Sequence, residues 1–146
     1  MWEPWQAEHW ASMTPTEQLE HKRGNMRTNI ETFGTGPRWS FAIEASATLV
    51  GMVDCDLANP HVPHGEANIS YSAHPAHRGN GYVSRAVRLV VQFIREDTSA
   101  REAHIVVDED NVASLRVAHA VGAVERERFV NDYGRTMVRH VIDLRG

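Results

Sequence analysis

Apolar and polar side chains alternate strictly along one stretch of the chain. Residues 68–73 read Asn-Ile-Ser-Tyr-Ser-Ala, and a period of two is the signature of a strand that buries one face. Pro75 has no N–H to donate to a sheet ladder, so the strand must stop before it. The pattern predicts a strand that begins at Glu66 and ends just before Pro75.

The residues after this strand change to the period of a helix. They follow a short loop that contains Gly79 and Gly81. The apolar positions are Val83, Val87, Val90 and Ile94, and the polar positions between them include Ser84, Arg85, Arg88, Gln92 and Arg95. This spacing places the apolar residues on one face. We therefore expect a long amphipathic helix directly after Gly81.

Further elements complete the expected fold. A second helix is predicted at 111–121, with Asn111 as its N-terminal cap and Gly122 as its C-terminal cap. A polar surface helix is expected at 15–28, because Thr14 and Glu17 have the spacing of a capping box. The remaining strands are expected at 38–44, 48–54, 103–107, 124–130 and 135–144, the last two as a hairpin through 131–134. This order predicts an α+β fold, in which a mixed sheet packs against helices.

Composition and charge narrow the class of protein. The 146 residues suit a single domain, 1–146, which opens with an irregular Trp-rich segment at 1–14. Cys55 is the only cysteine, which excludes an internal disulfide and fits a reducing cytoplasm. No apolar run approaches the roughly 20 residues that span a membrane. The net charge of −4 argues against nucleic acid as the main partner. We expect a cytoplasmic protein that does not contact a membrane.

The loop at 78–81, Arg-Gly-Asn-Gly, brings bare backbone and a guanidinium to the start of the long helix. A helix N-terminus exposes unpaired N–H groups and the positive end of the dipole, so an anion such as phosphate can bind there. A plain tight turn would also use these glycines. Two other phosphate loops are excluded by spacing, because Tyr82 and Val83 replace the Lys-Ser/Thr of a Walker loop and Ser84 replaces the third glycine of a dinucleotide fingerprint.

Residues 78–83 resemble the acetyl-CoA loop of the GNAT N-acetyltransferases, Arg/Gln-x-x-Gly-x-Gly/Ala, with Val83 as a departure at the last position. The run 66–91 is similar to the subgroup that acetylates the N-termini of ribosomal proteins. The resemblance continues through 110–114, Asp-Asn-Val-Ala-Ser, and through Val121-Gly122. It covers most of residues 38–144.

The resemblance implies a GNAT-like central mixed β-sheet of about six strands flanked by helices. The family starts with a strand and a helix before the helix that we expect at 15–28, and only 14 residues precede that helix here. Either the first strand is missing or the Trp-rich segment replaces it.

The resemblance also implies acetyl-CoA (coenzyme A) as cosubstrate and direct transfer of the acetyl group to a primary amine. The pantetheine arm would lie along the backbone before the loop, and the phosphates at the loop itself. Asn111, which can also cap its helix, would lie near the pantetheine, and Ser114 near the sulfur. The implied cofactor-binding residues are Ser72, Ala73, His74, Arg78, Gly79, Asn80, Gly81, Tyr82, Val83, Ser84, Asn111 and Ser114.

Two residues are candidates for catalysis by this resemblance. Glu66, where the subgroup also has Glu, would act as a base through water, and an exposed strand-end carboxylate is the alternative reading. Many GNAT proteins carry a Tyr as the acid that protonates the leaving thiolate, and that position is Ala118 here. Ser114 or bound water would then supply the proton.

Metal binding and the acceptor complete the expectations. The pairs His61/His64 and His74/His77 lie beside prolines in loops without cysteine, so we expect no metal site.

The acceptor would be a peptide N-terminus or a small-molecule amine, with specificity in the 58–65 loop, the N-terminal segment and the final hairpin. The resemblance also allows a homodimer. The alternatives are a GNAT-fold module that binds acyl-CoA without turnover, and an unrelated α+β ligand-binding domain.

Overall fold

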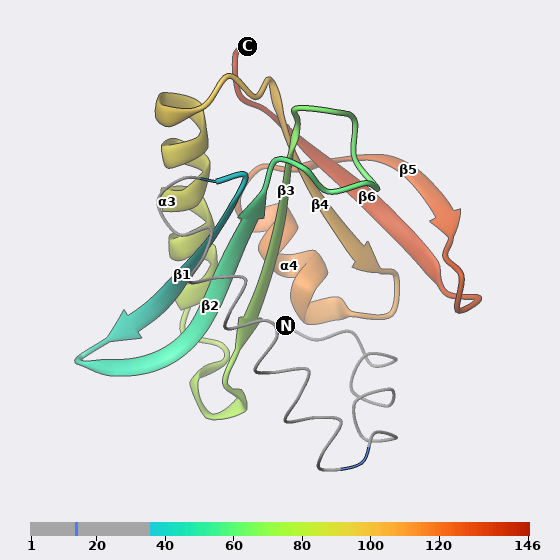
Figure 1. Ribbon diagram of the computed structural model, residues 1–146. Helices are drawn as coiled ribbons and strands as arrows, with labels where there is room; N and C mark the ends of the chain where they lie inside the picture. Colours follow the sequence, from blue (N-terminus) through green and yellow to red (C-terminus); the bar gives the residue numbers. More distant parts are fainter. Residues whose placement is uncertain (1–13, 15–35) are drawn as a thin grey trace.

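The computed structural model describes residues 14 and 36–146, and it contains one six-stranded sheet (Figure 1). The strands lie in the order β1-β2-β3-β4-β6-β5. Only β3 and β4 are parallel neighbours, and all other neighbours are antiparallel. The strands are β1 Arg38–Ala45, β2 Thr48–Asp56, β3 Ala67–Ala73, β4 Glu102–Asp108, β5 Val124–Val130 and β6 Thr136–Asp143.

Two helices cover one face of this sheet (Figure 1). Helix α3, Tyr82–Asp97, packs on β1, β2 and β3, while α4, Val112–Ala120, packs on β4. A short 3-10 turn, η1 Pro75–His77, joins β3 to the glycine loop. The mixed sheet and the order of elements from residue 38 onward are confirmed. The predicted helix at 15–28 and the question of a missing first strand lie outside the described residues.

The core lies between the sheet and the helices. The apolar face predicted for the long helix is buried, and it meets the inward side chains of the strands. Trp39 and Phe41 contact the Phe93 ring edge-on, at centroid distances of 5.4 and 5.5 Å. No helix among the described residues is long and apolar enough to cross a membrane. The largest fully buried apolar side chains are Ile69, Ile94, Ile105, Val53, Val87, Val107 and Val138.

Strands β3 and β4 separate soon after they begin. Their ladder consists of Ala67 opposite Ala103 and Asn68 opposite His104, so the rest of β3 runs beside a gap. The sheet is thereby divided into two halves, β1–β3 with α3 and β4–β6 with α4. Across the gap, the Tyr71 hydroxyl donates a hydrogen bond to the Ser114 carbonyl oxygen at 2.9 Å. This opening positions the candidate site.

Candidate functional site

The start of α3 is open to an anion. Gly81 is its N-cap with φ of 75°, and Gly79 has φ of 83°, so both residues adopt the left-handed conformation that favours glycine. The helix has no side-chain cap and no acidic residue in its first turn. Its first backbone bond runs from the Arg85 N–H to the Gly81 carbonyl. The preceding N–H groups therefore have no partner within the helix.

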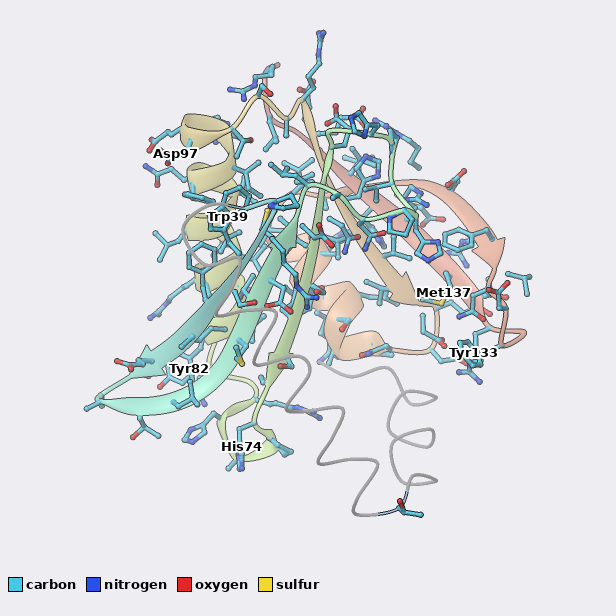
Figure 2. The ribbon with its side chains drawn as sticks, in the orientation of Figure 1. Trp39, His74, Tyr82, Asp97, Tyr133 and Met137 are labelled. Carbon is cyan, nitrogen blue, oxygen red and sulfur yellow. The ribbon has the colours of Figure 1, made fainter. Side chains whose placement is uncertain are left out.

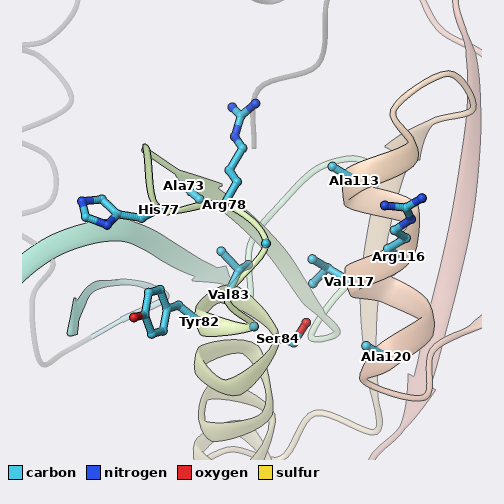
Figure 3. A pocket seen from close by; sticks show the side chains of 12 residues that line it. Ala73, His77, Arg78, Tyr82, Val83, Ser84, Ala113, Arg116, Val117 and Ala120 are labelled. Carbon is cyan, nitrogen blue, oxygen red and sulfur yellow. The ribbon is translucent and has the colours of Figure 1, made fainter. Parts of the chain in front are cut away.

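A cavity of about 280 Å³ lies at this helix start, and we call it the helix-side cavity. Figure 3 shows the loop and the first turn of α3 facing the side of α4 that carries Ala113, Val117 and Ala120. Arg78 and Arg116 contribute guanidinium groups, and no carboxylate is among the lining residues. Two cations and a helix N-terminus suit a phosphate-bearing ligand. The cavity is lined by Ala73, His77, Arg78, Gly79, Gly81, Tyr82, Val83, Ser84, Ala113, Arg116, Val117 and Ala120.

Most of the expected cofactor-binding residues line this cavity, and two loop residues do not. His74 and Asn80 instead stabilise the loop: the His74 Nδ1 accepts from the Ala76 N–H at 3.1 Å, and the Asn80 amide donates to the His77 carbonyl at 3.2 Å. Ser72 is also absent from the lining. His74 and Asn80 thus contribute to the shape of the loop rather than to the cavity surface.

The backbone of Ala73 faces the gap between β3 and β4. The His74 N–H donates to the Val50 carbonyl of β2 at 2.8 Å. Because N–H directions alternate along a strand, the Ala73 N–H points away from β2. It is therefore directed toward the space where β4 has diverged, and Ala73 itself lines the helix-side cavity.

Asn111 and Ser114 are buried at the start of α4. The Asn111 Oδ1 accepts the Ser114 N–H at 3.1 Å, which is the expected helix cap. Neither residue lines the helix-side cavity. Ala118, at the position of the family tyrosine, is fully buried in the core.

Glu66 lies at the opposite end of β3 from Ala73. Glu66 directly precedes the seven-residue strand and Ala73 is its last residue, so they are roughly 20 Å apart at the usual rise per residue. The Glu66 Oε2 accepts the backbone N–H groups of Arg101 and Glu102 at the start of β4. The structure therefore does not bring Glu66 to the helix-side cavity.

Sequence reasoning placed the start of α4 at the site through Asn111 and Ser114, but it missed the four α4 residues that line the cavity. Ala113, Arg116, Val117 and Ala120 all line the cavity, and their spacing places them on one helical face. This spacing was visible in the sequence. What was not visible is that the face lies opposite the start of α3, because that depends on how the two halves of the sheet pack.

A second cavity, of about 290 Å³, lies on the face of the sheet opposite α3 and α4, and we call it the open-face cavity. It combines residues of the 58–65 loop with residues of the final hairpin, which are two of the segments where we expect acceptor specificity. Figure 2 shows Tyr133 and Met137, two of its lining residues, close together at the end of this hairpin. The lining comprises Asn59, His61, Asn68, Ile69, Ser70, Val106, Phe129, Asn131, Asp132, Tyr133 and Met137.

The remaining candidate chemistry is sparse. In the part of the chain that the structure describes, no group of three or more His, Cys, Asp or Glu side chains is placed to hold a metal ion. The His74 and His77 rings lie 5.6 Å apart, tilted toward each other. Burial raises the pKa of the Cys55 thiol to about 12, with Asp56 and Asp54 adding to the effect. This thiol is a core group rather than a nucleophile.

Comparisons with known proteins identify the family and the fold of the chain. Residues 1–124 match the family model for the acetyltransferase (GNAT) domain. No curated protein matches the sequence significantly. Among solved structures, ribosomal-protein-S5-alanine acetyltransferase from Vibrio fischeri is 14% identical with a TM-score of 0.77, covering 99% of this chain and 79% of that one.

Two further structures are similar at low identity. The ribosomal L7/L12 N-acetyltransferase RimL, in complex with coenzyme A, is 17% identical with a TM-score of 0.75, over 85% of this chain and 72% of that one. The microcin C7 self-immunity acetyltransferase MccE, with acetyl-CoA and AMP, is 16% identical with a TM-score of 0.73, over 94% and 79%. At such identities these likenesses concern the fold. Together with the family model, they establish that the chain belongs to the GNAT acetyltransferase family.

Proposed function

We propose that this protein is an acetyl-CoA-dependent N-acetyltransferase that transfers the acetyl group directly to an acceptor primary amine. The amine nitrogen forms a bond to the thioester carbonyl carbon, and the carbon–sulfur bond breaks. Sulfur leaves with the electron pair as a thiolate and takes up a proton, while the new ammonium group loses one to water or to a base. No covalent enzyme intermediate is required.

The observation that carries this proposal is the uncapped start of α3. Its free N–H groups open into a cavity that holds Arg78 and Arg116 and no lining carboxylate. The diphosphate of coenzyme A has the charge that such a site stabilises. The Ala73 N–H, directed into the gap, can donate to the oxygen of the thioester as negative charge develops on it.

Two residues, Glu66 and Ser114, are the candidates for proton transfer. Glu66 stays a prediction as the base, and its bonds to two backbone N–H groups support a structural role instead. Ser114 stays a prediction as the source of the thiolate proton, with bound water as the alternative. A coenzyme A thiolate is a good leaving group, so activity does not require a dedicated acid.

A second candidate function is binding of acyl-CoA without turnover. Two observations favour it, the position of Glu66 away from the cavity and the buried Ala118 where many relatives carry a tyrosine. Acceptor-dependent release of coenzyme A separates the two functions, because only the enzyme liberates the thiol when an amine is added.

The first experiment is calorimetric titration with acetyl-CoA of the unmodified protein and of Gly81→Trp. We expect micromolar binding that is lost in the variant, because an indole at the N-cap covers the N–H groups. Gly65→Trp is the matched control. Both glycines have positive φ, 75° and 82°, and a Cβ at either meets no atom within 4 Å, so the cost to the fold is similar. Equal loss of binding in both variants, or none in Gly81→Trp, contradicts the assigned cavity.

A further inference from the structure

The open-face cavity has an apolar interior and a polar rim. Phe129, Met137 and Val106 supply the apolar surface, and the rim is built from the 59–61 loop and the 131–133 turn. Its volume of about 290 Å³ is at the lower end of ligand pockets, which span roughly 300–1,000 Å³. The cavity therefore fits a compact molecule, or one end of a larger one.

The charges on the rim favour a ligand with one positive charge. Asp132 is the single carboxylate of the lining, it forms no ion pair with any other described residue, and no Lys or Arg lines the cavity. An ammonium group gains from this carboxylate, whereas a ligand carboxylate finds no fixed cation. A polyamine, with several charges, would leave most of them beside apolar or amide groups.

The rim amides favour a ligand carbonyl. The Asn59 Oδ1 accepts the His61 N–H at 2.8 Å, and the Asn131 Oδ1 accepts the N–H groups of Tyr133 and Arg135, each at 3.0 Å. The two amide oxygens are thus used within their own turns. Both NH₂ groups lack a partner among the described residues, so they remain hydrogen-bond donors.

Arg139 holds the walls of this cavity together although it does not line it. Its side chain is 11% exposed and pairs with Glu127, Nε to Oε1, at 2.6 Å. Its Nη2 donates to the His61 carbonyl at 2.9 Å, which ties the loop to the sheet. Its guanidinium carbon lies 5.4 Å from the centroid of the Phe129 ring. Arg139 thus connects the loop wall to the aromatic wall.

The fourth contact of Arg139 is with His104, and it fixes the orientation of the guanidinium group. Nη1 lies 3.3 Å from the His104 Nδ1, and the His104 Nε2 lies 3.0 Å from the Glu102 carboxylate. Burial lowers the pKa of His104, and the Glu102 hydrogen bond partly offsets this. A neutral ring that donates to Glu102 and accepts from Arg139 satisfies both contacts.

The two cavities approach each other along β3. Ser70 lines the open-face cavity and Ala73 lines the helix-side cavity. Ser70 and Ala73 are three positions apart along the strand, which is about 10 Å. They lie on opposite faces of the sheet, at the place where β4 has diverged. A ligand in the open-face cavity is therefore near the Ala73 N–H without entering the helix-side cavity.

We propose that the open-face cavity binds the acceptor, and that the acceptor is a compact amine with one positive charge, an apolar or aromatic group and a neutral carbonyl. This inference rests on the proposed acetyltransferase function. Arg139 is a positioning residue for this site, and it acts through the His61 loop and Phe129.

The test is a steady-state assay of released coenzyme A thiol with four matched amines. L-phenylalaninamide carries every proposed feature, glycinamide lacks the aromatic group, L-phenylalanine replaces the amide with a carboxylate, and spermidine is a polyamine. We expect kcat/KM for L-phenylalaninamide to exceed each of the other values at least tenfold. Equal or better use of spermidine or L-phenylalanine overturns the proposed acceptor class.

Variants test the location of the site. Arg139→Gln should raise the KM for L-phenylalaninamide at least tenfold and change the Kd of acetyl-CoA by less than twofold. Arg126→Gln is the matched control, because Arg126 is an exposed arginine that pairs with Glu102 in the same network and touches neither His61 nor Phe129. It should leave both constants unchanged.

A second variant tests the location of the acceptor site if Arg139→Gln does not fold. Asp132→Asn changes an exposed turn residue and should raise the KM for L-phenylalaninamide about threefold without affecting acetyl-CoA binding. An unchanged KM in the folded Arg139→Gln or in Asp132→Asn, while the enzyme turns over, overturns the acceptor site alone. Failure to bind acetyl-CoA, or the absence of transfer to all four amines, refutes the proposed function instead.

Discussion

Glu66 illustrates how the neighbours of a carboxylate decide its role. It precedes β3, and its Oε2 accepts the Arg101 and Glu102 N–H groups where β4 begins. Those two strands pair only near this end. Within residues 36–146, the carboxylate thus reinforces the one place where the two halves of the sheet are joined by backbone hydrogen bonds.

We predict that Glu66→Gln lowers the thermal unfolding midpoint and leaves acetyl transfer largely intact. A neutral amide oxygen is a weaker acceptor than a carboxylate for two N–H groups, and the cost is about 1 kcal/mol. Calorimetric melting and the thiol-release assay measure the two effects. A large fall in kcat with an unchanged midpoint would restore Glu66 as the base.

The contacts of Arg139 could not be predicted from the sequence. The place of Gly81 at the start of α3 could be predicted from the sequence, because it depends on a turn and a helix start that are adjacent in the chain. Arg139 contacts His61 and His104, which are far from it in sequence. Nothing in the local pattern around Arg139 distinguishes it from any other strand arginine, so only the fold identifies it.

The turn between β1 and β2 has a backbone conformation that is unfavourable for the two residues that occupy it. Ser46 and Ala47 both have positive φ, 51° and 62°. A two-residue hairpin with two left-handed positions is normally occupied by Asn-Gly. The sequence predicted a turn near these residues, but it gave no sign of this conformation, because neither residue favours positive φ.

We predict that replacing Ser46 and Ala47 together by Asn and Gly stabilises the protein by about 1–2 kcal/mol, since the left-handed conformation costs residues with a side chain roughly this much. Urea unfolding measures the change. Ala86→Gly, within α3, is the control of opposite sign and should destabilise by about 1 kcal/mol. Stabilisation by Ala86→Gly, or no gain from the turn replacement, would contradict the assigned turn.

The strands and helices from residue 38 onward were well predicted because most of them follow a local period. The alternation of 68–73 and the spacing of Val83 to Ile94 each fix an element and its buried face. The divergence of β3 from β4 has no such signal. It arises from the packing of α3 and α4 on different halves of the sheet, which the order of elements does not specify.

At the scale of the whole molecule, buried histidines on both faces of the sheet link stability to pH. His104 is 2% exposed and His140 is 5% exposed. Burial lowers the pKa of both imidazoles below the ordinary value of 6.5. In the unfolded chain the same rings return to the ordinary value and bind protons more readily.

We predict that the free energy of unfolding is nearly constant between about pH 7.5 and pH 6.5 and falls as the pH decreases further, because the unfolded state then binds more protons. Urea midpoints between pH 7.5 and 5.5 measure this slope. His140→Leu should reduce the slope, because it removes one of the two buried imidazoles whose pKa is lowered. A slope unchanged by His140→Leu would contradict the shift assigned to that ring.

The opening between β3 and β4 also bears on inhibition. If the cosubstrate is held on the helix side and the amine on the open face, neither has to leave for the other to enter. A single molecule that joins coenzyme A to an amine through the gap would then occupy both cavities at once. The second half of such a molecule binds at the high effective concentration that its tether imposes. Its affinity should therefore exceed that of either half.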